Sequence, residues 1–292
     1  MRHSLKRPSV NLSTNLGLYC VAILVSLIAA FPASAAEGYR LPWFRPVQAV
    51  SNKLPEVAAG GQVRLLADQD FPPFSFASQT GGPAGLAVEL ALAACAEAKL
   101  VCEVSLRPFI ELLPALQVGQ ADVIIAGPRL DEPILDRALM TRPWFRTMGR
   151  FAVLKGNPLK DSDVRSLNAK RVGVVKDTLH ERWLASNYSA AEIVSFDDDA
   201  KAGEALRSGS VDAVFGDNLR LIYWLSGPAA AQCCRVLGGA YTDFQTFSRN
   251  LAFLVTPGSP ELREAFDHGL DMAQVNGTTE KIFNTYVPLN PW

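Results

Sequence analysis

The sequence predicts an α/β fold with mostly parallel sheets that is divided into two lobes. Short apolar segments typical of buried strands alternate along the chain with segments whose apolar residues recur at helical spacing. The order strand–helix–strand–helix–strand occurs twice, over residues 63–127 and again over residues 171–217. Ligands of such folds bind at the carboxyl ends of the strands, near helix N-termini, so we expect a binding site there.

Local signals place the individual elements. The first expected helix begins at a Gly/Pro turn and carries Leu86, Leu90 and Ala94 at helical spacing. A helix near the C-terminus has Ser259 at its N-cap and Gly277 at its end. The expected strands cover residues 63–67, 101–106, 121–127, 145–156, 168–177, 191–196, 211–217 and 250–258. The expected helices cover residues 81–100, 109–119, 178–187, 197–210, 218–227, 259–277 and 278–287.

Length and composition indicate an ordinary globular protein. The 292 residues are 49% hydrophobic and 20% charged, with a formal net charge of -1, which is enough chain for two domains. No excess of Lys and Arg points to nucleic acid, and we expect no nucleic-acid partner. Beyond the N-terminal segment only His180 and His268 are available as histidine ligands, and no phosphate-loop motif occurs. We therefore expect neither a bound metal nor a cofactor.

Residues 1–35 have the features of a secretory signal peptide. Basic residues precede a short apolar run, and small residues in an A-x-A pattern lead to a cleavage point after Ala35. A membrane anchor is the alternative, but the apolar run is shorter than the ~20 residues that a spanning helix needs. A lipoprotein site at Cys20 is disfavoured because Tyr19 is not a small residue. We expect a soluble, exported product.

Residues 36–61 form an N-terminal extension that is rich in Pro and Gly and has no periodicity. Two readings of Trp43 and Phe44 in this extension remain open. The pair either holds the extension against the domain surface or forms a contact with a partner.

Four cysteines remain after the signal peptide, and an oxidising compartment permits disulfides. Cys95 and Cys102 lie seven residues apart, across an expected helix end and the next strand, so we predict a bridge between them. Two buried thiols are the alternative. Cys233 and Cys234 are adjacent, and a bridge between neighbours is strained and rare. Free thiols or an intermolecular bond are at least as compatible with that pair.

Acids, prolines and aromatics follow the first expected strand, in the stretch DQDFPPFSF. The prolines stiffen the loop at the strand end, so that Phe71 can present the face of its ring to a ligand. Asp68 adds a negative charge beside it. The ends of other expected strands place residues 127–129, residues 176–179 and Asp217 at the same edge.

Several stretches together resemble a known family. They are DQDFPPFSF, the Cys95–Cys102 spacing, LPALQVGQADVIIAG with RPWF after it, KRVGVVKDT, SGSVDAVFGD and NGTTEKIFNTY. Their order and spacing, over about Gln62–Tyr286, are similar to those of the periplasmic solute-binding proteins of polar amino acid ABC transporters. The histidine-binding and lysine/arginine/ornithine-binding proteins are the most similar in this respect.

The resemblance implies the type II periplasmic binding protein fold, in which a double crossover joins two α/β lobes around a ligand cleft. The first lobe would comprise residues 62–149 plus 245–292, and the second residues 150–244. Closure of the lobes on a small molecule would present both lobes to the permease subunits at the inner membrane. The protein would act as a monomer in the periplasm, without enzymatic activity.

The resemblance also implies roles for individual residues. An aromatic at Phe71 would stack on the ligand, with Phe109 as the opposite wall. Asp217 would bind an α-ammonium group, and Asp68 a cationic side chain. Each has a structural alternative: core packing for the phenylalanines, a helix N-cap for Asp217 and a turn for Asp68. The expected ligand-binding set is Asp68, Phe71, Phe109, Gly127, Arg129, Lys176, Thr178, Leu179 and Asp217.

The sequence departs from the family where a ligand carboxylate would bind. Ile134 stands where the pattern Ser-x-Thr-x-x-Arg has an arginine that clamps this group, and Arg129 stands at the serine. Asp177 replaces a glycine usual at the N-terminus of a helix in the second lobe. In one reading Arg129 replaces the clamp with help from Lys176. In the other, the ligand is a cation or zwitterion without a conventional α-carboxylate.

Three functions are compatible with these features. A transport receptor is the first, and an enzyme similar to cyclohexadienyl dehydratases is the second. Glu89, Glu111 and His180 would be the acid–base candidates of such an enzyme, although none lies in a catalytic motif and both glutamates suit solvated helix faces. The third is an accessory binding or sensing protein of a periplasmic oxidoreductase system, which the missing arginine favours.

Overall fold

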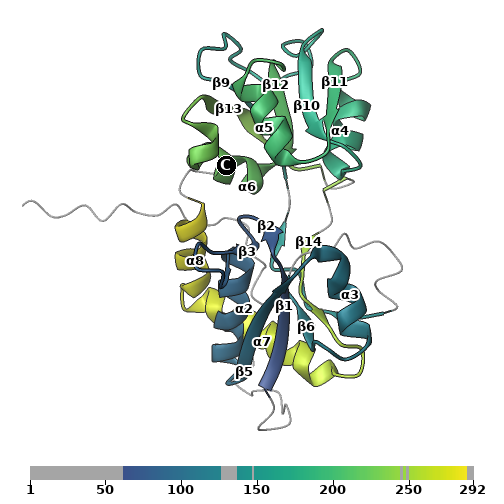
Figure 1. Cartoon of the computed structure of the whole chain (residues 1–292), viewed down its shortest axis with the longest axis vertical. Helices are drawn as coiled ribbons and strands as arrows, with labels where there is room; N and C mark the ends of the chain where they lie inside the picture. Colours follow the sequence, from purple (N-terminus) through teal and green to yellow (C-terminus); the bar gives the residue numbers. More distant parts are fainter. Residues whose placement is uncertain (1–61, 126–136, 147, 244–245, 248–249, 288–292) are drawn as a thin grey trace, which may run out of the picture. The chain divides into compact units, whose positions relative to one another are not determined.

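The computed structural model describes most of the chain beyond the N-terminal extension (Figure 1). The described residues are 62–125, 137–146, 148–243, 246–247 and 250–287. The expected signal peptide, the extension at 36–61, Gly127, Arg129 and Ile134 lie outside these ranges.

The first five-stranded sheet has the order β5-β1-β6-β15-β7. Strand β1 pairs in parallel with β5 and β6, whereas β15 runs antiparallel to β6 and β7. Its strands come from two separate parts of the chain: β1 (Gln62–Asp68), β5 (Val101–Arg107), β6 (Val123–Ile124), β7 (Leu139–Met140) and β15 (Leu254–Val255). Its helices are α2 (Leu86–Glu97), α3 (Phe109–Gln117), α7 (Pro260–Val275) and α8 (Thr278–Tyr286).

The second five-stranded sheet has the order β11-β10-β12-β9-β13. Strands β10, β11 and β12 run parallel, and β9 runs antiparallel to both β12 and β13. Its strands come from one continuous part of the chain: β9 (Gly149–Leu154), β10 (Arg171–Val175), β11 (Glu192–Phe196), β12 (Ala213–Asp217) and β13 (Cys234–Tyr241). Helices α4 (Leu179–Asn187), α5 (Asp199–Arg207) and α6 (Asn218–Ser226), and the 3-10 helix Pro228–Ala230, lie between these strands in the chain.

Two smaller sheets complete the described strands. Strands β2 (Asp70–Phe71), β3 (Ser75–Ala77) and β4 (Pro83–Ala84) form an antiparallel sheet directly after β1. Strand β8 (Phe145–Arg146) pairs antiparallel with β14 (Asn250–Leu251), so two chain segments on either side of the second sheet in sequence lie together.

The α/β class with helices and strands in alternation is confirmed, but the expectation of mostly parallel sheets is wrong. Each large sheet combines two parallel pairings with two antiparallel ones. The antiparallel pairings belong to β9, β13 and β15. These strands are not linked to their sheet neighbours by the strand–helix–strand crossovers that produce parallel pairing. The expected strand over 145–156 is in fact two, β8 and β9.

Helices α2 and α7 pack closely against each other beneath the first sheet (Figure 1). A glycine makes this approach possible, because a Cβ on Gly269 would lie 2.1 Å from the carbonyl oxygen of Ala94. Leu90 and Ala94 of α2 are fully buried in the same core as Phe266 and Leu270 of α7. The apolar spacing of Leu90 and Ala94 therefore marks the face of α2 that meets α7.

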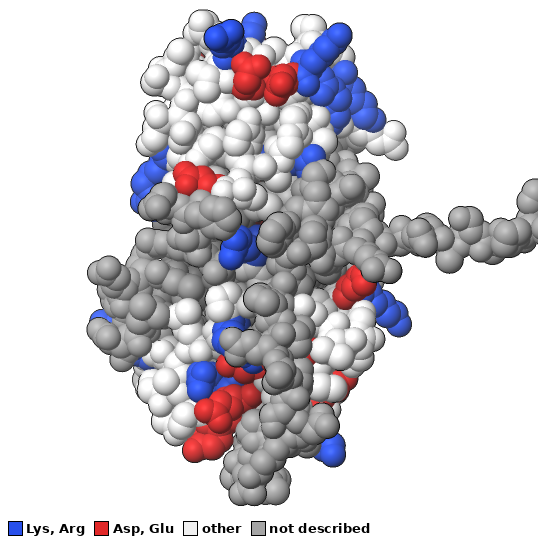
Figure 2. Space-filling model, turned by 180° about the vertical axis from the view of Figure 1, so that it is seen from behind, with Lys and Arg blue, Asp and Glu red and all other residues white. Residues whose placement is uncertain are grey.

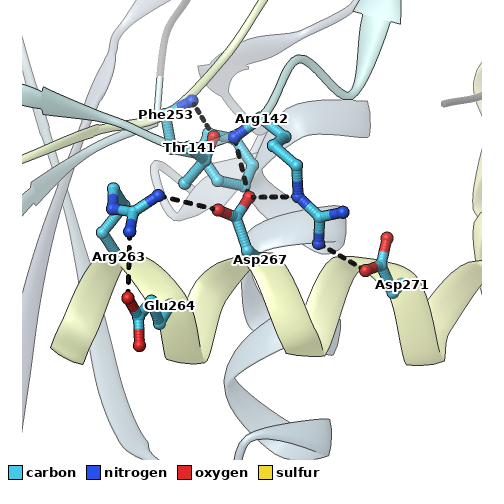
Figure 3. A network of polar contacts seen from close by, with 7 residues as sticks. All are labelled: Thr141, Arg142, Phe253, Arg263, Glu264, Asp267 and Asp271. Carbon is cyan, nitrogen blue, oxygen red and sulfur yellow. Dashed lines mark hydrogen bonds and ion pairs between the residues drawn. The ribbon is translucent and has the colours of Figure 1, made fainter. Parts of the chain in front are cut away.

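A polar network fastens α7 to the chain segment before β8 (Figure 3). The Asp267 carboxylate accepts a 2.7 Å hydrogen bond from the backbone N–H of Arg142, and it also contacts the guanidinium of Arg263. Asp271 accepts a 2.5 Å bond from the guanidinium of Arg142. Both aspartates are buried, and Thr141 bonds the backbone N–H of Phe253 beside them. The network is structural, since it orients α7 against β7 and β15.

The predicted disulfide between Cys95 and Cys102 is confirmed, and it ties the last turn of α2 to β5. Cys233 and Cys234 are also joined to each other. The structure therefore contains neither free thiols nor an intermolecular bond at Cys233 and Cys234. The adjacent cysteines lie at the start of β13, after the 3-10 helix, where residues Ala231 and Gln232 take a left-handed backbone conformation.

Charged side chains of both signs lie beside one another on the face shown in Figure 2. Ion pairs among the described residues include Arg64 with Asp122 at 2.8 Å and Arg171 with Asp212 at 3.0 Å. Over the described ranges no helix has the length and hydropathy to cross a bilayer. The same part of the chain holds no cluster of three or more metal-ligating side chains.

Candidate ligand-binding site

The end of β1 places an acid and an aromatic ring next to each other. Asp68 is the last residue of β1 and is 8% exposed, and its carboxylate accepts a 3.1 Å bond from the backbone N–H of Asp70. Burial raises the pKa of Asp68, because a charged carboxylate is costly away from water. Phe71 is half-buried and stacks on Phe74, with ring centroids 5.1 Å apart. Phe74 is fully buried and anchors the loop in the core.

The guanidinium of Arg220 covers the ring of Phe71, with its Cζ 4.7 Å from the ring centroid. Arg220 belongs to the first turn of α6 and is also paired with Asp199 at 2.8 Å. Its positive charge acts on both Asp68 and Asp217 and opposes the rise in their pKa values. The structure therefore brings together an aromatic face, two acids and a cation, and Arg220 is the member that the sequence reasoning missed.

Asp217 ends β12 and caps α6. Its Oδ1 accepts hydrogen bonds from the backbone N–H groups of Leu219 at 3.0 Å and Arg220 at 3.1 Å. Burial is the main cause that raises its pKa to about 6, against the lowering effect of these bonds and of the Arg220 charge. The expected helix cap is therefore present in the structure, and it uses Oδ1 of the carboxylate.

The N-terminus of α4 is occupied by the protein's own side chains. The Thr178 hydroxyl accepts a 3.1 Å bond from the N–H of Glu181 and donates a 2.7 Å bond to the carbonyl of Val175. The Glu181 carboxylate accepts a 2.7 Å bond from the N–H of Asp177. The arrangement resembles a capping box, except that the glutamate accepts from the residue before the N-cap. Asp177 has a φ of +59°, in the left-handed region that glycine adopts without strain and that aspartate tolerates better than most residues.

Lys176 pairs with Asp197 at 2.6 Å, and Asp197 also contacts Lys201 at 2.5 Å. All three side chains are exposed, and the two lysines lower the pKa of Asp197 to about 2. The amine of Lys176 is therefore engaged in a surface ion network. Leu179 is partly buried against the aromatic core of the second sheet.

Phe109 begins α3 after Pro108 and is 49% exposed, so it is not a plain core residue. Its surface position leaves the ring available for contact with a ligand or partner. Gly127 and Arg129 lie outside the described residues, so the structure gives no position for either.

Two acid–base candidates have structural partners. Glu89 is half-buried, not on a solvated face as expected, and accepts a hydrogen bond from the hydroxyl of Tyr286, which joins α2 to α8. His180 packs between the rings of Phe215 and Phe247, with centroid distances of 5.8 and 5.1 Å. Burial lowers the pKa of His180 to about 4, so it is neutral at neutral pH. The third, Glu111, is exposed on α3.

Two mixed five-stranded sheets with their helices, together with the likeness to solved amino-acid-binding proteins, define the fold as that of the type II periplasmic binding proteins. Residues 63–288 match the family model of bacterial extracellular solute-binding proteins, family 3, and the chain belongs to that family.

Known proteins similar to this chain carry names from amino acid transport. An "L-arginine-binding protein" of Pseudomonas aeruginosa is 28% identical over 235 residues, covering 80% of this chain and 90% of that protein. The "ABC transporter arginine-binding protein 1" of Escherichia coli is 25% identical over 232 residues, covering 79% and 93%.

Solved structures give the same class. An "ancestral arginine-binding protein bound to arginine" is 28% identical, with a TM-score of 0.58, covering 78% of this chain and 98% of that one. The second substrate-binding domain of Lactococcus lactis GlnP in the open conformation has a TM-score of 0.70 at 21% identity, covering 81% and 99%. At that identity the latter likeness concerns the fold alone.

Proposed function

We propose that this protein is the periplasmic solute-binding receptor of an ABC importer. It binds a small cationic, amino-acid-like metabolite in a cleft between two lobes and delivers it to permease subunits at the inner membrane. The first lobe comprises residues 62–149 plus 245–292 and the second residues 150–244, and a hinge motion closes them on the ligand. The chain is exported through a signal peptide over residues 1–35 and works as a monomer.

One observation carries this proposal: the ring of Phe71 accepts a planar cation at 4.7 Å while Asp68 and Asp217 lie within its electrostatic reach. A guanidinium over an aromatic face, balanced by carboxylates, is a favourable arrangement for cation–π contact. The names of the relatives, several of which are arginine-binding proteins, support a ligand of this charge.

Each proposed contact has a distinct role. Phe71 stacks on the ligand and Phe109 forms the opposite wall. Asp217 binds an ammonium group and Asp68 a cationic side chain. The remaining contacts come from Gly127, Arg129, Lys176, Thr178 and Leu179. Glu89 is hydrogen-bonded to the Tyr286 hydroxyl, and His180 packs against the Phe247 ring. Because both side chains are engaged in structural contacts, the arrangement favours binding over catalysis.

Thermal unfolding of the purified protein with arginine, ornithine, histidine, glutamine and agmatine tests the proposal. A ligand at 100 times its Kd stabilises a protein by about 2.7 kcal/mol, which raises the midpoint of a chain of this size by roughly 5–10 °C. We expect arginine or agmatine to produce such a shift and glutamine to produce none. If no cation in the series moves the midpoint, the receptor function is wrong.

A matched pair of variants tests the site. Phe71→Leu removes the ring that meets the cation, whereas Phe76→Leu removes a ring of the same small sheet that contacts Tyr223 and Tyr286 instead. Both residues are half-buried. We expect Phe71→Leu to weaken binding about tenfold and Phe76→Leu to leave the Kd within about twofold. Equal effects of the two changes would mean that Phe71 makes no direct contact.

A further inference from the structure

The side chain of Arg220 occupies the position that the proposed function assigns to a ligand cation. Arg220 is in the first turn of α6, and its guanidinium lies 4.7 Å from the centroid of the Phe71 ring. Phe74 is stacked on the Phe71 ring at 5.1 Å. The ring of Phe71 therefore contacts both the Phe74 ring and the Arg220 guanidinium.

Arg220 is held in this position by its own lobe. The guanidinium is paired with Asp199 of α5 at 2.8 Å, and the side chain is only 26% exposed. The backbone N–H of the same residue donates to Asp217, which fixes the start of α6. Asp217 thus fixes the backbone at the base of the side chain, and Asp199 holds the guanidinium at its tip, beside Phe71.

The acids around Phe71 are already balanced by this internal cation. The positive charge of Arg220 lowers the pKa values of Asp68 and Asp217 and so opposes the increase that burial causes. A second cation on the same face would meet the Arg220 guanidinium at close range, and two like charges there are unfavourable. A cationic ligand can therefore use the Phe71 face only after Arg220 has left it.

We propose that Arg220 is an internal occupant of the ligand site, which stacks on Phe71 without ligand and is displaced by a guanidinium or ammonium ligand. The inference rests on the proposed function, because it concerns the same ring and the same acids. Arg220 then sets the threshold for binding: a cation must compete with a tethered guanidinium. A ligand displaces the Arg220 guanidinium effectively only if it makes additional contacts with the protein. Binding of simple inorganic cations and small amines is therefore disfavoured.

Calorimetric titration of arginine and agmatine into Arg220→Gln, Asp199→Asn and wild-type protein tests the inference. Loss of the internal competitor should tighten binding of both ligands about tenfold in Arg220→Gln, the range of one desolvated cation–π contact. Asp199→Asn keeps the arginine but releases its anchor, and should tighten binding by a smaller factor. Arg207→Gln is the matched control, since it removes another arginine paired with an acid, Glu204 of α5, and should leave the Kd unchanged.

The outcomes separate this inference from the proposed function. If wild-type protein binds arginine and Arg220→Gln binds it equally or more weakly, the receptor function stands and the internal occupant is wrong. A loss for arginine with none for agmatine would identify Arg220 as a carboxylate ligand and also overturn the inference. If only Arg220→Gln binds a cation, the occupant is supported and the receptor function of the natural protein fails. If neither protein binds any cation, both ideas are wrong.

Discussion

Protonation of Asp217 should weaken binding of a cationic ligand as the pH falls from 7 to 5. Burial raises the pKa of this carboxyl to about 6 in the ligand-free protein. A bound cation favours the ionised carboxylate and therefore lowers the pKa in the complex. Binding then releases a proton at any pH between the two values, and the affinity falls with decreasing pH over that range.

The size of the effect follows from the pKa. At pH 5 about one free molecule in ten carries an ionised Asp217, so the Kd for arginine should rise about tenfold relative to pH 7. Burial also raises the pKa of Asp68 from its ordinary value. His180, with a pKa of about 4, stays neutral throughout this range.

Calorimetric titration with arginine at pH 7, 6 and 5 measures this dependence. Asp217→Asn keeps a side-chain oxygen that can accept from the N–H groups of Leu219 and Arg220, so α6 retains its cap while the charge is lost. This variant should bind more weakly at pH 7, with a flatter profile, and Asp68→Asn measures the remaining contribution. If Asp217→Asn keeps the full tenfold decrease, Asp217 is not the group that titrates.

The same carboxyl affects the stability of the ligand-free protein with the opposite sign. Because the pKa of Asp217 is higher in the folded than in the unfolded chain, the free energy of unfolding decreases as the pH rises from about 4 to 6. Asp217→Asn should therefore be more stable than wild type at pH 7, by on the order of 2 kcal/mol. Urea unfolding at pH 7 and pH 4 measures the difference, which should vanish at the lower pH.

Further predictions concern the described scaffold, and urea unfolding measures each of them. Replacement of Cys95 and Cys102 by serine should lower the free energy of unfolding by about 2–3 kcal/mol, the value for a short closed loop; an unchanged value would mean that the bridge does not form. Asp267→Asn should cost about 3 kcal/mol because it leaves buried donors and a guanidinium without their anion. Glu264→Gln, at the exposed edge of the same network, should cost less than about 0.5 kcal/mol; similar losses for both would contradict the buried role. Thr178→Ala should cost about 1 kcal/mol through loss of the α4 N-cap, and no loss would show that the cap is dispensable.

Helices whose apolar residues recur with a regular spacing were predictable from the sequence. The apolar spacing of Leu90 and Ala94 in α2 marks the face that packs on α7, and Ser259 and Gly277 flank α7 as expected. Strand β13 was not predicted, because its paired glycines and an arginine interrupt any alternation. Its pairing with β9 depends on contacts far apart in sequence, which local propensity does not encode.

The candidate site was only partly predictable, because some of its residues come together through tertiary contacts. Asp68, Phe71 and Asp217 could be named because strand ends of an α/β fold share one edge. Arg220 could not be assigned to Phe71, because on sequence alone it is one cation on an expected helix. Its role depends on the turn of α6 and on the ion pair with Asp199, both of which are tertiary features.

The N-terminus of α4, where a helix could attract an anion, is engaged by the protein's own carboxylates. By the resemblance drawn from the sequence, Ile134 stands at the position expected for an arginine that would bind a carboxylate. At the N-terminus of α4, where helix dipole and N–H groups attract anions, the carboxylate of Glu181 already accepts from Asp177, whose own charge adds to it. A ligand carboxylate at that end would meet two negative charges. At Phe71 and its two neighbouring acids, a ligand cation has to displace only the guanidinium of Arg220, and its charge is then attracted by both carboxylates. The charge of the ligand's cationic end should therefore matter more for affinity than its carboxylate, and agmatine should bind this protein at least as well as arginine.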